Sequence, residues 1–265
     1  MADAGIGPRW RIKAVMKPVS LSLAWEETLA FIKREGALIF PVALLFIAIP
    51  LALILQILPD QLREMTPGAP PPPAAMLSGG ATAAIAAAAM VILGGALSCY
   101  ALAVKPGVSL REALALGFRR VPHAFAAAFL VGIALAVPLM LLTMVSPQVA
   151  SLYMVAASLF FSVRFLFLNV VIVDRLDGPV SAIRRSWAMT RGNAGRILML
   201  VVVITLPIML VQTVAGILLG LVGYALGGPE VGKQLSDIGT AVALALGQLF
   251  MIVLTVRLYR QLPPV

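Results

Sequence analysis

The sequence predicts an all-α integral membrane protein with six transmembrane helices. We expect three repeated units, each made of an interfacial amphipathic helix followed by a transmembrane hairpin. Composition, the length of the apolar runs and the placement of the basic residues lead to this prediction. Hydrophobic residues make up 61% of the 265 residues and charged residues 12%, against about 25% charged residues in soluble domains. A soluble protein of this composition would have almost no charged surface, so we expect the chain to be embedded in a lipid bilayer.

Six apolar windows are long enough to cross a bilayer, which takes about 20 residues of α-helix. The fourth window contains Arg164 and Asn169 and is therefore the least uniformly apolar. No polar segment separates the windows into independent domains, so residues 1–265 are predicted to form a single membrane domain. The windows cover approximately residues 37–58, 79–104, 124–145, 149–173, 196–222 and 238–258.

The basic residues alternate between the two sides of this predicted topology. Of the 20 lysines and arginines, 17 lie before the first window, after the second, after the fourth, or in the C-terminal tail. The intervening loops hold only Arg63 and Lys233. Because Lys and Arg accumulate in cytoplasmic loops, both termini are predicted to be cytoplasmic. This topology accounts for the net charge of +9, and no nucleic-acid partner is expected because no segment is polar enough to form a water-facing basic domain.

The segment before each odd-numbered window follows one pattern. It starts at Ser22, Ser109 or Ser181, runs through about ten amphipathic residues, ends in basic residues and enters an apolar window. Such a helix is too short to span, so each is expected to lie in the cytoplasmic interface. "VRFLFLN" from Val163 also resembles "VRLYRQL" from Val256. The predicted repeat units cover approximately residues 20–104, 105–173 and 174–260.

The stretch "DRLDGPVSAIRRSWAMTRGN", residues 174–193, is the predicted cytoplasmic elbow between the fourth and fifth windows. Its arginines are explained by topology as positive-inside anchors, with the tryptophan at headgroup level. The alternative is a specific site, because guanidinium groups bind phosphate oxygens in bidentate fashion. The candidate anionic headgroup or phosphate-binding residues are Arg164, Arg184, Arg185, Arg191 and Trp187.

Arg164 has two interpretations. If the fourth helix ends near Leu168, its side chain reaches the lipid phosphates from the membrane edge. If the helix continues, the arginine is buried between helices and binds an anionic headgroup or solute, since a charge inside the bilayer is costly and usually functional. The candidate intramembrane polar helpers are Asn169, Gln212 and Gln248.

No catalytic constellation is present in the sequence. His123 is the only histidine, Cys99 is the only cysteine, and the eleven acidic residues lie in loops or at membrane edges. Metal-assisted hydrolysis and nucleophilic catalysis need clusters of such groups. We therefore predict no enzyme activity, no catalytic residues, no metal and no cofactor.

The stretch "VVIVDRLDGPVSAIRRSWAMTRGNAGRIL", residues 170–198, with Arg164 just upstream, resembles the signature of the glycerophosphoryl diester phosphodiesterase membrane-domain family. This resemblance implies a multi-helix domain of the bacterial cytoplasmic (inner) membrane. Some members are fused to a soluble phosphodiesterase barrel, which would add roughly 200 residues or more. This chain lacks room for that barrel, so it resembles the stand-alone members, and the phosphodiesterase activity is not carried over.

The predicted function is that of a non-enzymatic inner-membrane protein with a role in envelope or lipid organisation. Its expected partners are anionic membrane lipids, a protein partner or a second copy of the chain. The alternative is a transporter or channel for a small anionic solute that uses Arg164 between the repeats.

Overall fold

The computed structural model describes residues 20–59 and 78–262, and within these ranges it contains helices and no strand. The predicted all-α class is confirmed. Five helical stretches of the described chain are long and apolar enough to cross a membrane, as expected of a multi-pass membrane protein. The proline run "TPGAPPPPAA", for which a short spacer is expected, and the basic residues before Ser20 lie outside the described residues. The five stretches are Leu21–Ile57, Gly79–Val104, Leu110–Val145, Pro147–Asp174 and Ala194–Gln261.

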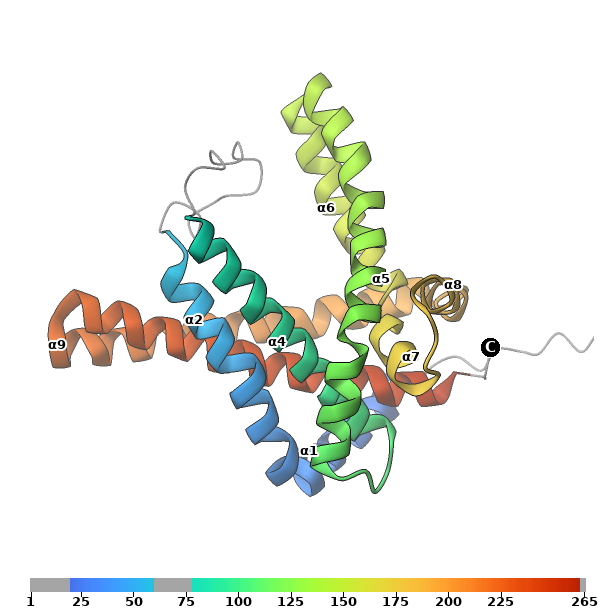
Figure 1. Ribbon diagram of the computed structural model, residues 1–265, viewed down its shortest axis with the longest axis horizontal. Helices are drawn as coiled ribbons and strands as arrows, with labels where there is room; N and C mark the ends of the chain where they lie inside the picture. Colours follow the sequence, from blue (N-terminus) through green and yellow to red (C-terminus); the bar gives the residue numbers. More distant parts are fainter. Residues whose placement is uncertain (1–19, 60–77, 263–265) are drawn as a thin grey trace, which may run out of the picture.

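The long helices form three hairpins that rise from a common base and diverge from one another (Figure 1). In the first, α2 (Ile49–Ile57) pairs with α4 (Gly79–Val104), and in the second, α5 (Leu110–Val145) pairs with α6 (Pro147–Arg164). The third is α9 (Ala194–Gln261), which folds back on itself.

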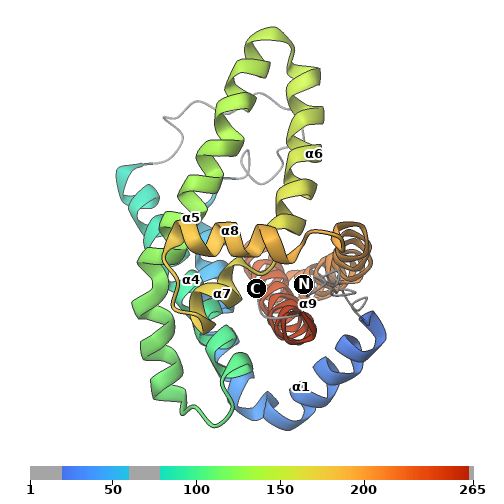
Figure 2. The ribbon, with the colours of Figure 1, turned by 90° about the vertical axis from the view of Figure 1, so that its right-hand side faces the viewer.

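The base contains the ends of these hairpins and three further helices. They are α1 (Leu21–Ala43), α7 (Leu168–Asp174) and α8 (Pro179–Met189), and the π-helical turn η1 (Leu44–Ala48) joins α1 to α2. Figure 2 shows α1 along the lower edge of the base and α7 and α8 beside the chain end of α9.

The last two predicted windows both lie in α9, where a loop was expected over residues 223–237. Instead the chain stays helical except at Gly227 and Gly228. Gly228 has a φ of 79°, a value that favours glycine. The two arms pack antiparallel: Cβ atoms built on Gly216 and Gly247 would lie 2.5 Å from Thr240 Oγ1 and Ile208 Cγ2 respectively. Small residues therefore let the arms of the α9 hairpin approach closely.

The predicted short amphipathic helices differ in how they end. The first continues through Gly36 into the rest of α1, and the second continues through Pro122 into the span of α5. Only the third forms a separate helix, α8, because the chain turns after Thr190 and Gly192 adopts a φ of 84°. The first two segments are thus not separate helices and the third is, while the interfacial position stays a prediction.

Serine side chains begin most of the long helices. Those of Ser20, Ser78 and Ser146 each accept a hydrogen bond from the backbone N–H three residues later. Ser109 and Glu112 form the predicted capping box at the start of α5, and Pro179 occupies the first turn of α8 as expected.

The fourth predicted window is two helices. α6 ends at Arg164, the chain turns over residues 165–167, and α7 follows with Val170, Val171, Ile172 and Val173 fully buried. α7 packs against α4, α5 and α8, which explains why most of its residues are apolar. This break places Arg164 at the base end of α6.

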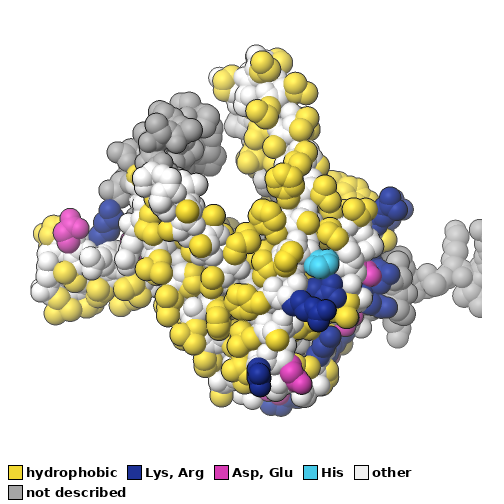
Figure 3. Space-filling view, in the orientation of Figure 1, with side chains coloured by type: hydrophobic (Ala, Val, Ile, Leu, Met, Phe, Trp, Pro, Cys, Tyr) yellow, Lys and Arg dark blue, Asp and Glu magenta, His cyan; other side chains and the backbone are white. Residues whose placement is uncertain are grey.

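Most of the charge visible in Figure 3 lies over the base. Lysine and arginine side chains gather over the base, whereas the second hairpin that rises from it is covered by apolar side chains. Large apolar residues such as Met144 and Leu226, near the hairpin tips, are 85% and 76% exposed. Exposed apolar surface of this extent suits contact with lipid.

Candidate anion-binding sites

Arg164 lies against two aromatic rings that contact each other where α6 meets α8. Its Cζ is 4.9 Å from the ring centroid of Trp187 and 5.4 Å from that of Phe160, which are cation–π distances. Nη1 donates a hydrogen bond to Thr190 Oγ1 at 3.2 Å. Nε has no hydrogen-bond partner within the described ranges. The side chain as a whole is half-buried.

Two buried hydroxyl groups hold this junction together. Ser186 Oγ donates to the Arg164 carbonyl oxygen at 2.8 Å, and Thr190 Oγ1 donates to the Trp187 carbonyl oxygen at 3.0 Å. Both hydroxyl residues are fully buried. They fix α8 against the end of α6 and so set the position of the tryptophan ring over Arg164.

The outer face of α8 carries a shallow hollow of about 350 Å³ lined by Ile183, Arg184, Trp187, Ala188 and Arg191. Arg184, Trp187 and Ala188 lie on one face of α8, and Arg191 lies in the turn that follows the helix. Arg184 and Arg191 are exposed and form no ion pair with any residue that the structure describes. We call this hollow, with Arg164 behind Trp187, the elbow site.

Arg185 is held apart from the elbow site by an ion pair. Its Nε lies 3.3 Å from Asp177 Oδ2, in the turn before α8. The structure thus brings together four of the five candidate headgroup-binding residues and gives the fifth a local partner.

The three intramembrane polar candidates lie elsewhere. Asn169 is half-buried in α7, whereas Gln212 and Gln248 occupy the two arms of α9. Gln212 Oε1 is buried with no hydrogen-bond partner among the described residues, and Gln248 is exposed. The hydrogen-bonding partner of Arg164 is Thr190, which the sequence analysis did not single out.

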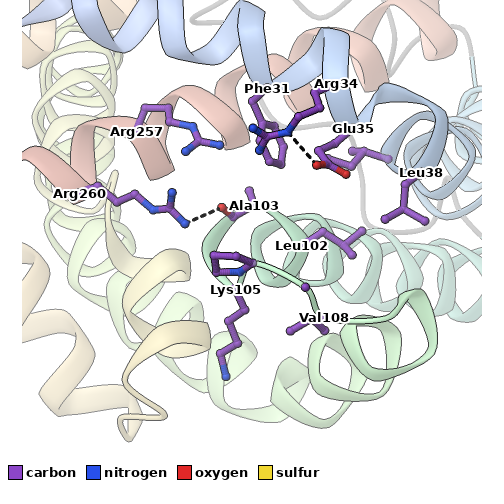
Figure 4. A pocket seen from close by; sticks show the side chains of 13 residues that line it. Phe31, Arg34, Glu35, Leu38, Leu102, Ala103, Lys105, Val108, Arg257 and Arg260 are labelled. Atoms are coloured by element: carbon purple, nitrogen blue, oxygen red, sulfur yellow. Dashed lines mark hydrogen bonds and ion pairs between the residues drawn. The ribbon is translucent and has the colours of Figure 1, made fainter.

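A second, more enclosed hollow lies elsewhere in the base (Figure 4). It has a volume of about 270 Å³ and is bounded by α1, the end of α4, the turn that follows α4 and the end of α9. We call it the base pocket. Its charged lining residues are Arg34, Glu35, Lys105, Arg257 and Arg260.

The arginines of the base pocket are positioned by defined contacts. Arg260 Nη2 donates to the carbonyl oxygens of Ala103 at 3.3 Å and Val104 at 2.8 Å, where it caps the C-terminus of α4. Arg34 Nε pairs with Glu35 Oε1 at 2.9 Å. The Arg257 Cζ lies 4.5 Å from the ring centroid of Phe31.

Sequence reasoning missed the base pocket because its residues were counted only as topological anchors. The lining comes from three segments, of which the first and the last are more than 200 residues apart, and hydropathy does not pair them. One signal was available: the likeness between "VRFLFLN" and "VRLYRQL" puts Arg257 at the position that corresponds to Arg164. Both guanidinium groups lie over an aromatic ring of a base helix.

The end of α9 is also tied to the elbow. The Tyr259 hydroxyl donates to Asp174 Oδ2 at 2.6 Å and accepts from Arg175 Nε at 3.3 Å. This hydrogen bond to Tyr259 raises the pKa of Arg175 above its usual range, so the arginine stays charged. Polar contacts thus connect the elbow to the helix that supplies Arg257 and Arg260.

Over the described ranges 20–59 and 78–262, no group of three or more His, Cys, Asp or Glu residues is placed to hold a metal ion. Cys99 is buried in α4, and His123 lies in α5.

Comparison of the chain with protein-family models, with curated proteins and with solved structures gives no match. The arrangement of the arginines in the base therefore carries the functional argument.

Proposed function

We propose that this chain is a non-enzymatic, multi-pass protein of the bacterial inner membrane that binds the phosphate groups of anionic lipids at its elbow site. The observation that carries the proposal is the hollow that Arg184 and Trp187 of α8 line together with Arg191 of the following turn, with the Arg164 guanidinium over the tryptophan ring. A role in envelope or lipid organisation follows from such binding.

The chemistry of α8 favours a lipid headgroup as the ligand. The helix is short and amphipathic, carries two arginines and a tryptophan, and is followed by a third arginine, a composition typical of helices in the membrane interface. Each basic residue near an anionic surface contributes about 1 kcal/mol of binding free energy. Arg184 and Arg191 are free for this role, since only Arg185 is paired with Asp177.

The proposed topology has six spans and cytoplasmic termini. The gathering of lysine and arginine side chains over the base supports it, because the positive-inside rule then puts the base in the cytoplasm. The two antiparallel arms of α9 supply the fifth and sixth spans of this proposal. The resemblance to the glycerophosphoryl diester phosphodiesterase membrane-domain family stays a prediction that agrees with this topology.

Contacts in the base also support the proposed threefold repeat. Trp187, in the third predicted unit, lies over Arg164 at the end of the second, and Phe31, in the first, lies over Arg257 at the end of the third. Phe118, in the second unit, packs against Gly94 near the end of the first. Each unit thus places an aromatic ring on the unit before it, and the three contacts close a ring.

Native mass spectrometry of the purified protein in a mixture of phosphatidylglycerol and phosphatidylcholine tests the lipid proposal. The wild type is expected to retain phosphatidylglycerol in preference to phosphatidylcholine. The double variant Arg184→Gln/Arg191→Gln is expected to lose about 2 kcal/mol of that preference, roughly a thirtyfold change in the ratio of bound lipids.

The matched control is Arg111→Gln/Arg119→Gln, which removes two exposed arginines from the base end of α5. It is expected to retain most of the preference. An equal loss in both double variants, or no anionic preference in the wild type, would contradict the proposal. In the second case, uptake of a small anion into proteoliposomes would favour the transporter alternative.

A further inference from the structure

We propose that the base pocket binds a phosphate group, supplied as inorganic phosphate or as the phosphate monoester headgroup of a lipid. This site is distinct from the elbow site, shares no lining residue with it and does not depend on the lipid proposal above. Arg34, Arg257 and Arg260 are the residues proposed to bind the anion.

The charges around the pocket are unbalanced. Three arginines face it, and Glu35 is the only acidic residue in its lining. Arg34 and Arg257 both approach the ring of Phe31, with Cζ-to-centroid distances of 5.9 and 4.5 Å. Like charges gathered in a partly enclosed hollow repel one another and focus a positive potential in it. An anion with close to two negative charges, such as a phosphate monoester, would offset the excess.

Arg257 supplies an unsatisfied donor that points to such a ligand. The residue is only 9% exposed, and its Nε has no hydrogen-bond partner within the described chain. The nearby charges that act on it include Arg34 and Arg260, which repel it, and Glu27, which attracts it. A buried guanidinium with an unpaired N–H destabilises the protein unless the N–H finds a hydrogen-bond acceptor. Arg257 lines the pocket, so a phosphate oxygen there is a suitable acceptor.

The direction of the side chains agrees with one shared ligand. Figure 4 shows the guanidinium groups of Arg257 and Arg260 extending from α9 in the same direction, toward α1 and the end of α4. The Lys105 side chain extends away from them, so it is not assigned to the site. Arg260 is already fixed by the α4 carbonyl oxygens, which reduces the entropy lost on binding.

The size of the pocket limits the ligand. Its volume of about 270 Å³ is just below the range of about 300–1,000 Å³ for sites that hold drug-sized molecules. A phosphate group with a small substituent therefore fits, whereas acyl chains would have to lie outside it.

Thermal unfolding of the full-length protein tests this proposal in two arms. In phosphatidylcholine nanodiscs, sodium phosphate is titrated against sodium chloride at matched ionic strength. In the second arm, nanodiscs that contain phosphatidic acid replace those of pure phosphatidylcholine. Stabilisation by phosphate in the first arm identifies a free ligand, and stabilisation only in the second identifies a lipid headgroup. Either result supports the proposal.

Variants separate the pocket from general charge effects. Arg257→Gln is expected to weaken the apparent affinity about tenfold or more, as expected for a lost charge-assisted hydrogen bond. Arg111→Gln, which removes an exposed arginine elsewhere in the base, is expected to stay within about twofold of wild type. Glu35→Gln removes the one acidic lining residue and is expected to strengthen binding about threefold.

The gain expected for Glu35→Gln cannot come from misfolding, so it keeps the proposal testable if Arg257→Gln fails to fold. The Arg184→Gln/Arg191→Gln variant is expected to bind phosphate in the base pocket as the wild type does. Its behaviour therefore distinguishes a failure of the phosphate proposal from a failure of the proposal that the elbow site binds lipid. No stabilisation in either arm, or equal losses in Arg257→Gln and Arg111→Gln, would overturn the proposal.

Discussion

At Gly117 the backbone of α5 touches that of α4. A Cβ atom built on this glycine would lie 2.2 Å from Ser98 Oγ, 2.6 Å from the Ser98 amide nitrogen and 2.8 Å from the Gly94 carbonyl oxygen. No side-chain rotation relieves contact with backbone atoms. Close approach through small residues is a common way for membrane helices to gain packing contacts. The seam between α4 and α5 therefore depends on this single missing methyl group.

We expect Gly117→Ala to push α4 and α5 apart and to lower the stability of the protein by about 1–3 kcal/mol, the usual cost of overpacking. Thermal unfolding in detergent measures it. The control is Gly132→Ala in the same helix, where a Cβ meets no atom within 4 Å. The control should be neutral or slightly stabilising, because alanine favours helix more than glycine does. Equal effects of the two changes would show that the seam is looser than described.

At the scale of elements, the elbow of residues 174–193 is a turn followed by α8. Leu176 in this turn has a φ of 57°, in the left-handed region that residues other than glycine rarely adopt. Arg120 Nη1 donates to the Leu176 carbonyl oxygen at 3.3 Å and holds this turn against α5. The turn orients α8, and α8 in turn carries the elbow site.

Comparing Leu176→Gly with Leu176→Ala isolates the backbone strain at this turn, because both variants lose the half-exposed leucine side chain. We expect the glycine variant to be more stable than the alanine variant by about 1 kcal/mol, since only glycine adopts positive φ without a steric penalty. The melting temperatures of the two variants give the measurement. An alanine variant as stable as the glycine variant would mean that the turn is not strained.

At the scale of the whole molecule, apolar hairpins diverge from a charged base. The inner ends of the helices are buried against α7 and against each other, as the buried run from Gly94 to Val104 in α4 illustrates. The outer halves expose large apolar side chains. Packing between different hairpins is therefore concentrated in the base, and lipid is the expected partner of the exposed apolar side chains beyond it.

Single-cysteine labelling checks the proposed orientation, with Cys99 as a silent background because it is fully buried. Gln148→Cys lies in an exposed position near the tip of the second hairpin, and Arg111→Cys lies at its base. In intact cells made permeable only at the outer membrane, an impermeant maleimide should label the tip cysteine. The base cysteine should react only after lysis. The opposite pattern would reverse the topology.

Hydropathy, helix-start signals and charge placement are local properties, so the sequence alone predicted what depends on them. It predicted the all-α class, the capping box of Ser109 with Glu112 and the proline at the start of α8. It left open whether the fourth helix ends near Leu168, and it did not predict that a second helix, α7, follows a turn at residues 165–167. The position of α7 depends on its packing against α4, α5 and α8, which local patterns do not specify.

The candidate sites also combine features that sequence spacing implied with features that only tertiary packing decided. Arg184 and Trp187 share a face of α8, so their proximity was implied by spacing alone, whereas the turn after α8 places Arg191 beside them. The position of Arg164 behind Trp187 required α8 to dock on the end of α6, which Ser186 and Thr190 secure. The base pocket was beyond local reasoning, because it forms only when the two ends of the chain pack together around α4. Sequence by itself determined which residues are charged and at which helix ends they lie. The tertiary structure decided which of those charges meet, because packing between distant segments places them.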